Sequence, residues 1–258
     1  CWMFFENDAL KFSFDTTCGQ FSVYDKRAGR YAVKGAAFSV NGHLSTACTS
    51  FSVSRFPFVD AIGAGEAAQI AGTDGTGDTV LLRVQLYKDR SCVTARCGYR
   101  SAAGDSIRIC EMIPLQTDGS AEHYVSVGGD PHHNHRVLTG EGGFSYPRLL
   151  DAVDGTSLNA LTVVRLEKPD CAAAVLAGLT TFEFQTEISV HTAENGAPCG
   201  FAAEIRQFDA TGKLVDAGCD FWGDFVYLEV SEPDPYTALE NYAVCVAKAM
   251  DVQLNNYN

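Results

Sequence analysis

Polar and hydrophobic residues alternate along most of this chain. Leu10, Phe12 and Phe14 stand at every second position, and the run from Val80 to Leu86 has the same period. Because successive side chains of a β-strand point to opposite faces, this alternation indicates strands with one buried face. Further segments with a strand pattern are Phe21–Val23, Tyr31–Val40, Leu44–Val53, Ser91–Gly98, Ser106–Ile113, His123–Val127, Ala160–Leu166, Ala172–Leu179, Glu183–Val190, Ala202–Phe208 and Phe225–Glu229.

Short turn signals rich in Gly, Asn and Asp separate these segments. They are Asn41-Gly42, Thr73–Asp78, Asp118-Gly119, Asp154-Gly155, Glu194–Gly196 and Thr211-Gly212. Many short strands joined by such turns predict an all-β fold, built as a large antiparallel sandwich. The longest stretch without a strand pattern is Gly128–Asp154, which we expect to be an irregular loop.

The last part of the chain predicts one helix, from Ser231 to about Asp251. Ser231 or Asp234 can serve as the N-cap, because a short side-chain oxygen accepts hydrogen bonds from the first backbone N–H groups. Pro235 suits the first helical turn, where its missing N–H is not needed. An apolar stripe at steps of four, three and four residues is formed by Leu239, Ala243, Val246 and Met250.

The order of these elements bears on the extent of the sequence. A β-rich domain that ends in one amphipathic helix is typical of the front part of a longer protein. The first residue is Cys1 rather than Met. We therefore expect this sequence to be a segment, truncated at both ends.

Composition and charge narrow the class of protein. The chain has 258 residues, of which 46% are hydrophobic and 20% charged, enough for a large core in one folded domain. Its net charge of −13 argues against nucleic acid and anionic membranes as partners, because both need clustered cations. No apolar run reaches the roughly 18 residues of a membrane span. No Asn-x-Ser/Thr sequon occurs, so we expect a cytoplasmic protein, although a truncated N-terminus would also lack a signal peptide.

Ten cysteines are spread along the chain without a C-x-x-C pair. Zinc ribbons and fingers need such close pairs to place thiolates around the metal. A core of this size needs no disulfide staples either. We therefore expect mostly buried free thiols, and neither a metal centre nor another cofactor.

The C-terminal residues resemble a known family. From Asp234 to Ala243 the chain reads Asp-Pro-Tyr-Thr-Ala-Leu-Glu-Asn-Tyr-Ala. The whole stretch Asp220–Asn258 resembles the junction between two domains in glycoside hydrolases of the α-galactosidase and raffinose-synthase type (family 36). Two further stretches, Asp78–Val93 and Val175–Val190, are similar to that family as well.

The resemblance implies a division of the chain. Residues 1–230 would form a β-supersandwich of galactose-mutarotase-like architecture. Residues 231–258 would form a linker helix that leads to a catalytic (β/α)8 barrel absent from this chain. The parent enzyme would hydrolyse or transfer α-linked galactose with retention of configuration. Its implied partners are an α-galactoside oligosaccharide, its own barrel and further copies of itself.

The same resemblance implies that both catalytic carboxylates belong to the barrel. The family's nucleophile lies in a K-x-D motif, and Lys168-Pro169-Asp170 matches its letters. However, Pro169 and the surrounding strand pattern predict a turn, and no alternation of strands and helices surrounds it. We therefore expect no catalytic residue in this chain. Its expected role is to support the barrel and to shape the mouth of the substrate pocket.

Asp220, Trp222 and Asp224 lie in a short acidic and aromatic turn. A Trp ring can stack on the apolar C–H face of a sugar, while neighbouring carboxylates accept hydrogen bonds from the hydroxyls. The resemblance also implies that aromatic residues of such a domain can approach the sugar pocket of a barrel. The alternative interpretation is a core Trp between strands.

The expected loop holds a second group of candidates, formed by His132, His133, His135 and Arg136. The His residues and Asp130 are competent metal ligands, although only His133 and His135 share a face in extended backbone. A second interpretation is a sugar-facing loop whose His and Arg side chains donate to hydroxyls. The third is a polar surface loop without a ligand.

Two other functions compete with the glycoside hydrolase hypothesis. A stand-alone carbohydrate-binding β-sandwich would have the same strand pattern, but it has no use for an apolar helical face at its end. A mutarotase-like epimerase needs a His general acid and a Glu general base on one sheet surface. His123 or His191 with Glu183 or Glu187 could supply that pair.

Overall fold

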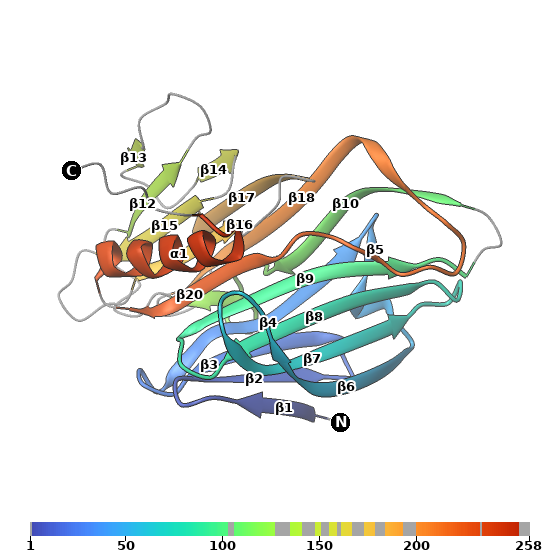
Figure 1. Ribbon diagram of the computed structural model, residues 1–258, viewed down its shortest axis with the longest axis horizontal. Helices are drawn as coiled ribbons and strands as arrows, with labels where there is room; N and C mark the ends of the chain where they lie inside the picture. The colour runs from blue at the N-terminus through green and yellow to red at the C-terminus, as the bar shows by residue number, and fades with distance from the viewer. Residues whose placement is uncertain are drawn as a thin grey trace.

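The computed structural model describes residues 2–102, 106–126, 135–140, 148–150, 155–158, 161–166, 173–178, 184–192, 200–232 and 234–252. These residues form two antiparallel β-sheets that face each other, with one α-helix on the outer side (Figure 1). The expected all-β sandwich followed by a C-terminal helix is therefore confirmed.

One sheet, called sheet A below, contains the N-terminal strands. In spatial order its strands are β1 (Trp2–Glu6), β2 (Leu10–Asp15), β3 (Gln20–Asp25), β4 (Arg30–Val40), β10 (Ile107–Gln116), β18 (Gly200–Val215), β17 (Gln185–Thr192) and β14 (Gly155–Leu158). The short strand β11 (Tyr124–Ser126) pairs with β4 and β18, and β5 (His43–Leu44) pairs with β4.

The second sheet, sheet B, carries the helix. In spatial order its strands are β13 (Arg148–Leu150), β12 (His135–Gly140), β15 (Leu161–Leu166), β16 (Ala173–Gly178), β20 (Val226–Glu232), β9 (Cys92–Arg100), β8 (Thr79–Tyr87), β7 (Ala64–Thr73) and β6 (Ser50–Val59). The short strand β19 (Phe221–Trp222) pairs with β9, and a 3-10 turn, η1, covers Ser45–Ala47.

The main hydrophobic core lies between the two sheets. Leu10, Phe12 and Phe14 of β2 are all 0% exposed, and Leu82 and Val84 of β8 are equally buried in the same cluster. These residues belong to the alternating runs, so the two-residue period identified both the strands and their inward faces.

Strand β7 was not predicted. Its residues Ala64–Thr73 include only one β-branched hydrophobic side chain, Ile70, among small residues with low strand propensity. Its backbone nevertheless pairs in unbroken register with β6 and β8 on either side. Backbone pairing with β6 and β8 therefore outweighs the weak strand propensity of the β7 residues.

Three other expectations need correction. The expected loop Gly128–Asp154 contains strands β12 and β13. The predicted strand Leu44–Val53 is broken by η1 into β5 and β6. The predicted turn at Thr211-Gly212 lies inside β18, where Asp209 accepts hydrogen bonds from both backbone N–H groups and the register with β10 shifts.

Helix α1 spans Pro235–Ala249, within the predicted range. The Asp234 carboxylate caps it by accepting from the Tyr236 and Thr237 N–H groups at 3.3 and 3.2 Å, which selects Asp234 over Ser231 as the N-cap. β20 continues to Glu232, two residues past the expected start of the linker helix.

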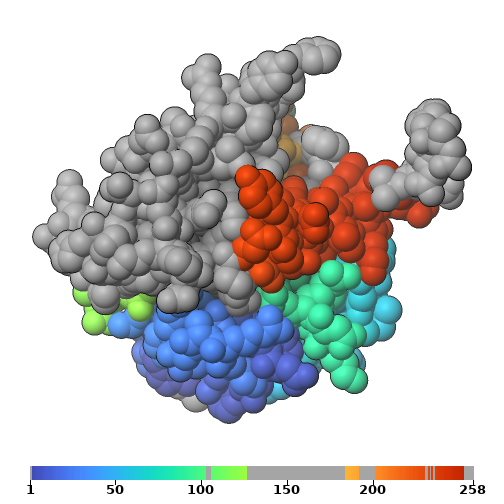
Figure 2. All heavy atoms as spheres, turned by 90° about the vertical axis from the view of Figure 1, so that its left-hand side faces the viewer, coloured from blue at the N-terminus to red at the C-terminus, as the bar shows by residue number. Residues whose placement is uncertain are grey.

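The packed face of α1 differs from the predicted stripe. Ala238 and Cys245 are 0% and 1% exposed and lie in a second hydrophobic cluster on the outer face of sheet B, and Leu239 and Val246 pack beside them. Met250, by contrast, is 42% exposed. Figure 2 shows α1 in red, seated above the turn that joins β8 and β9. Small side chains face the sheet because they let the helix approach it closely.

Seven cysteines lie in the described residues, and all of them are free thiols. Cys92, Cys97 and Cys245 are buried, whereas Cys18, Cys110 and Cys219 are exposed and Cys48 is half-buried. The expectation of free thiols is confirmed for these seven, but they are not mostly buried. In the described part of the chain, no helix is both long and apolar enough to cross a membrane.

Candidate functional site

The three predicted sugar-contact residues near Trp222 have different surroundings. The Asp220 carboxylate forms a bidentate ion pair with Arg100, at 2.5 Å to Nε and 2.8 Å to Nη2. Asp224 is 8% exposed, and its Oδ2 accepts a hydrogen bond from the Phe184 N–H at 3.3 Å. Both carboxylates are thus engaged by the protein. Asp224 is buried, whereas Asp220 remains exposed and Trp222 is half-buried.

The Trp222 ring lies on the outer face of sheet B. Cys97 and Tyr99 point into the main core, so Gly98 between them faces outward. A Cβ atom on Gly98 would lie 2.8 Å from the Trp222 ring, which shows that the indole covers this glycine. Trp222 is therefore not a core residue between the sheets, and the alternative interpretation made from the sequence is wrong.

Two arginines extend the surface beside Trp222. Arg83 and Arg96 are cross-strand partners on β8 and β9. The Arg96 guanidinium lies 4.9 Å from the centre of the Trp222 ring and 4.6 Å from that of Phe225, while Arg83 lies 4.9 Å from that of Phe56. We call these five residues the arginine–aromatic strip.

Among the described residues, neither Arg83 nor Arg96 forms an ion pair with a carboxylate. The Nε atoms of Arg83 and Arg96 are buried and have no hydrogen-bond partner among the described residues. Burial lowers the pKa of Arg96, and the neighbouring Arg83 adds to this effect. Because like charges repel, the pair is held by its aromatic neighbours. The strip offers guanidinium donors and ring faces, a combination that suits a sugar or a carboxylate.

The His residues of the other candidate group lie elsewhere. His132 and His133 fall outside the described residues, whereas His135 and Arg136 begin β12. β12 is separated from β9 by four strand steps, roughly 19 Å. The register also places His135 level with the residues before Cys92, at the end of the sheet opposite Trp222. The described members of the two groups therefore do not form one common sugar-contact surface.

A cluster of charged residues lies on the outer face of sheet A, and sequence reasoning missed it. Arg206 of β18 binds Glu111 at 2.5 Å and Glu187 at 3.4 Å. Glu204, two residues earlier on the same face, is half-buried, and burial together with the Glu111 charge raises its pKa. The alternation Glu204-x-Arg206 inside a strand was the available signal.

The residue pairs proposed for an epimerase do not meet in a catalytic arrangement. Glu187 is bound by Arg206, and His191 lies four residues further along β17, roughly 13 Å away. His123 is hydrogen-bonded to Gln20 and Asp118 instead. Glu183 lies outside the described residues. No described pair among the four candidates is thus placed as a joint acid and base.

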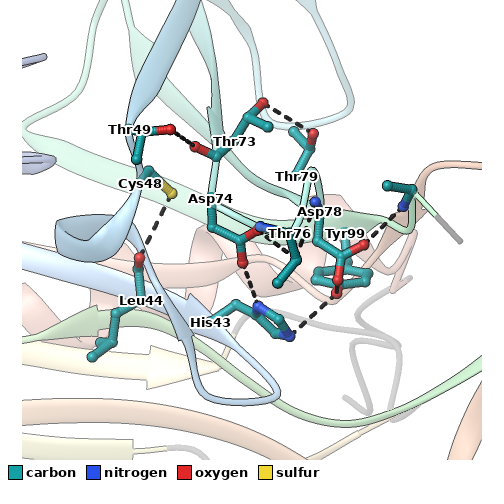
Figure 3. Close-up of polar contacts among 11 residues, drawn as sticks. His43, Leu44, Cys48, Thr49, Thr73, Asp74, Thr76, Asp78, Thr79 and Tyr99 are labelled. Carbon is teal, nitrogen blue, oxygen red and sulfur yellow. Dashed lines mark hydrogen bonds and ion pairs between the residues drawn. The ribbon is translucent and has the colours of Figure 1, made fainter.

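A polar network closes one end of the sandwich (Figure 3). His43 Nδ1 donates to Asp74 at 2.6 Å, its Nε2 lies 3.3 Å from the Tyr99 hydroxyl, and that hydroxyl donates to Asp78 at 2.7 Å. Burial opposes ionisation of Asp74, but hydrogen bonds from Thr76 and His43 lower its pKa overall. The network joins β5, the β7–β8 turn and β9.

This network has no activated nucleophile. The nearby Cys48 Sγ lies 3.6 Å from the Leu44 carbonyl oxygen, and burial raises the pKa of this thiol to about 11. A thiol with such a pKa holds its proton at neutral pH and is a poor nucleophile. The network therefore connects β5, the β7–β8 turn and β9 at this end of the sandwich, and Cys48 is not placed to act as a nucleophile.

A small polar cavity of about 110 Å³ lies where α1 meets sheet B. Its buried carboxylate is Glu229, which is 1% exposed. Glu229 accepts hydrogen bonds from Ser91 Oγ at 3.0 Å, Tyr227 Oη at 2.8 Å and Asn241 Nδ2 at 3.1 Å. Burial raises the pKa of Glu229 despite these three donors. The contacts join β20, α1 and Ser91, the residue before β9, so this cavity belongs to the junction between helix and sheet.

Comparison with known proteins gives matches only at the level of structure. No protein-family model matches the chain, and no curated protein matches it either. Within the described residues, no group of three or more His, Cys, Asp or Glu side chains is placed to hold a metal ion. Only the similarity of the fold therefore relates the sites on the sheet faces to known proteins.

Several solved glycosidases contain this fold. An α-N-acetylgalactosaminidase from Bifidobacterium bifidum matches 98% of this chain with a TM-score of 0.58 at 12% identity. The GH36 α-galactosidase AgaA from Geobacillus stearothermophilus, in complex with raffinose, matches 90% with a TM-score of 0.55 at 11% identity. An α-galactosidase from Lactobacillus brevis matches 96% with a TM-score of 0.57 at 8% identity.

The match covers only part of each enzyme. This chain spans 40%, 41% and 42% of the three glycosidase chains, respectively. At such low identity the likeness shows the fold alone. The resemblance to family-36 glycoside hydrolases is thereby confirmed at the level of the fold.

Proposed function

We propose that this chain is the N-terminal, non-catalytic β-supersandwich domain of a retaining glycoside hydrolase that acts on α-galactosides. The carrying observation is the fold match over nearly the whole chain, which leaves more than half of each matched glycosidase unaccounted for. The junction-like residues Asp234–Ala243 support the same proposal, because they form the N-cap and the first turns of α1, the helix that follows β20.

The carboxylates of the described residues fit a supporting role. Retaining glycosidases need two carboxyl groups about 5–5.5 Å apart that flank a sugar site. Glu111 and Glu187 are both bound by Arg206 on a sheet face. Glu229 is enclosed by its three hydrogen-bond donors. Lys168-Pro169-Asp170 lies outside the described residues, and we continue to assign it no catalytic role.

In this proposal α1 is the contact to the catalytic barrel. One face of the helix packs on sheet B, while its other side exposes Tyr236, Val244 and Met250 at 71%, 46% and 42%. Val252, just beyond the helix, is 51% exposed. A domain that follows the helix would cover these apolar side chains and gain the free energy of their burial.

We further propose that Trp222 forms part of the wall of the substrate mouth. Its partners there are the arginines of the strip rather than the carboxylates of Asp220 and Asp224, because both carboxylates are already engaged. The ring would stack on a sugar while Arg96 donates to a hydroxyl. His135 and Arg136 remain separate sugar-contact candidates at the other end of sheet B.

The first experiment compares this chain with the product of the same gene extended past Asn258, on a chromogenic α-galactoside. We expect turnover by the extended protein and none by the chain alone. Turnover by the chain alone that disappears in Asp170→Asn would overturn the assignment and place a catalytic carboxylate here.

The second experiment tests the substrate mouth in the extended enzyme. Trp222→Ala should lower kcat/KM by a factor corresponding to about 1–3 kcal/mol, as expected for losing one pocket contact. Leu214→Ala, at another exposed apolar residue, is the matched control and should leave kcat/KM unchanged. Equal kinetics of Trp222→Ala and the control would contradict a role for the ring in substrate binding.

A further inference from the structure

A hollow of about 420 Å³ lies on the outer face of sheet A, among strands β1 to β4. It is lined by Trp2, Phe4, Lys11, Ser13, Tyr24 and Tyr31. Its volume lies within the roughly 300–1,000 Å³ range of small-molecule sites. Three of its four aromatic residues, Trp2, Phe4 and Tyr31, are 63%, 52% and 38% exposed.

The hollow follows from strand register. Ser13 of β2 is the cross-strand partner of Phe4 and lines the hollow, while its other partner, Ser22 of β3, is buried beside it. Trp2 and Phe4 stand on β1, at the edge of the sheet. Tyr24 and Tyr31 are paired across β3 and β4 and form the opposite wall. Small residues flanked by large rings leave a depression.

These rings do not contribute to the core. Phe5, Phe12 and Phe14 point inward from the same strands and are at most 1% exposed. The outward aromatic residues therefore bring large apolar surfaces to water without stabilising the sandwich interior. Exposed patches of large apolar side chains are found at binding sites more often than on the rest of a protein surface.

The polar groups of the hollow indicate the kind of ligand. Three of the lining residues, Ser13, Tyr24 and Tyr31, carry hydroxyl groups. Lys11 also lines the hollow, and its ammonium group lies 4.3 Å from the centre of the Phe4 ring. The Tyr24 and Tyr31 rings meet edge to face at 5.3 Å. A pyranose matches this mixture, because it presents apolar C–H faces to rings and hydroxyls at its edges.

Charge favours a neutral occupant. Within the described part of the chain no carboxylate lines the hollow, so these residues offer no anchor for a basic peptide. The net charge of −13 opposes an anionic ligand and also the docking of a second copy of this chain. A purely apolar segment would offer no hydrogen-bond partner to the hydroxyl groups of Tyr24 and Tyr31, at a cost in free energy.

We propose that this hollow is a surface site for one pyranose unit of a neutral oligosaccharide. It lies on sheet A, whereas Trp222 and the arginine–aromatic strip lie on sheet B, so the two sites are separate. The site would hold a carbohydrate chain near the protein without taking part in bond cleavage. This proposal does not depend on the proposed catalytic barrel.

Tryptophan fluorescence can test the proposal directly, because the chain contains only two tryptophans, Trp2 and Trp222. In Trp222→Phe the remaining indole reports on the hollow. Titration with raffinose, and separately with maltotriose, should shift the emission of Trp2 to shorter wavelength and protect it from acrylamide. We expect saturation with a dissociation constant on the order of 1 mM for at least one of the two sugars.

Two further variants of Trp222→Phe sharpen the test. Tyr31→Ala removes one wall, and Ser13→Leu fills the floor, so each should weaken binding at least about tenfold, while Leu214→Ala should not. The complementary Trp2→Phe chain, in which only Trp222 reports, should show no such change if the sugars bind the hollow alone.

Absence of a saturable change up to about 100 mM of either sugar would refute the proposal. So would a concentration-dependent dimer that Trp2→Ala converts to a monomer in sedimentation analysis, because a second copy would then occupy the hollow. In the extended enzyme, Tyr31→Ala should leave hydrolysis of a small chromogenic α-galactoside unchanged. Failure of this site is thereby distinguishable from failure of the proposed function.

Discussion

Glu229 is the residue for which the structure makes the sharpest prediction about stability. Its carboxylate is 1% exposed and accepts hydrogen bonds from Ser91, Tyr227 and Asn241. Even so, burial raises its pKa above the ordinary value of 4.5. The ionised carboxylate therefore loses more by leaving water than it gains from three donors.

The sign of the pH effect follows from this shift. Well below pH 4.5, Glu229 is protonated in the folded and the unfolded chain. As the pH rises, the unfolded chain releases this proton first, and the folded state becomes relatively less stable until its own pKa is passed. Each unit by which the pKa is raised costs about 1.4 kcal/mol.

The Glu229→Gln substitution removes the charge and keeps the shape. Its amide oxygen can still accept from Ser91 and Asn241, and its amide nitrogen can donate to the Tyr227 hydroxyl oxygen. We expect the variant to be more stable than the natural chain at pH 7.5, by roughly 1–2 kcal/mol. At pH 4 the difference should be close to zero or reversed.

Glu229→Leu is the matched control, because it removes the charge and also the acceptor. It leaves three donors at the helix–sheet junction without their partner, so we expect a loss of roughly 2–5 kcal/mol at both pH values. Urea unfolding of the three proteins between pH 4 and 8 measures these differences. A free-energy difference between Glu229→Gln and the natural chain that stays constant over this range would refute the reasoning.

Three further predictions concern other parts of the chain. Asp234→Ala should destabilise the protein by about 1 kcal/mol in urea unfolding, because two N–H groups of α1 lose their cap, while Asp234→Asn should restore most of the loss. Glu204→Gln should stabilise the chain by up to about 1 kcal/mol at pH 7.5 and not at pH 4, because burial and the Glu111 charge raise the pKa of Glu204; a constant effect would contradict this. Amide exchange should be faster over residues 238–249 than over Val80–Leu86, because one side of α1 is exposed, and equal protection would show that the helix is as firmly held as the central strand.

The local sequence pattern predicted the strands and the helix well where a few consecutive residues determine the element. The alternation at Leu10, Phe12 and Phe14 identified a strand and its inward face, and the Asp234-Pro235 pair identified the start of α1. It failed for β7, whose small residues give no local signal and which depends on pairing with β6 and β8. The local pattern also predicted the wrong buried face for α1. A helix with apolar residues on more than one side can pack on either, and the surface of the sheet determines which side is buried.

The candidate sites depended on contacts between residues far apart in sequence. Ser91 and Glu229 are 138 residues apart, and Arg100 and Asp220 are 120 apart, so no sequence window contains either pair. The chemistry of Trp222 was expected from its neighbours Asp220 and Asp224, yet its ring partner is Arg96 on another strand. The hollow on sheet A likewise depends on the register that places Ser13 between Phe4 and Ser22.

The sequence by itself determined that this protein is an all-β sandwich with a capped C-terminal helix, because alternation and capping are properties of a few consecutive residues. Its resemblance near the C-terminus also indicated the family-36 fold. Only the tertiary structure decided which side chains are free to meet a ligand. Asp220 and Asp224 are engaged by Arg100 and Phe184, whereas Trp222 is not enclosed, and that difference arises because long-range strand pairing, rather than residue type, selects each side chain's partners.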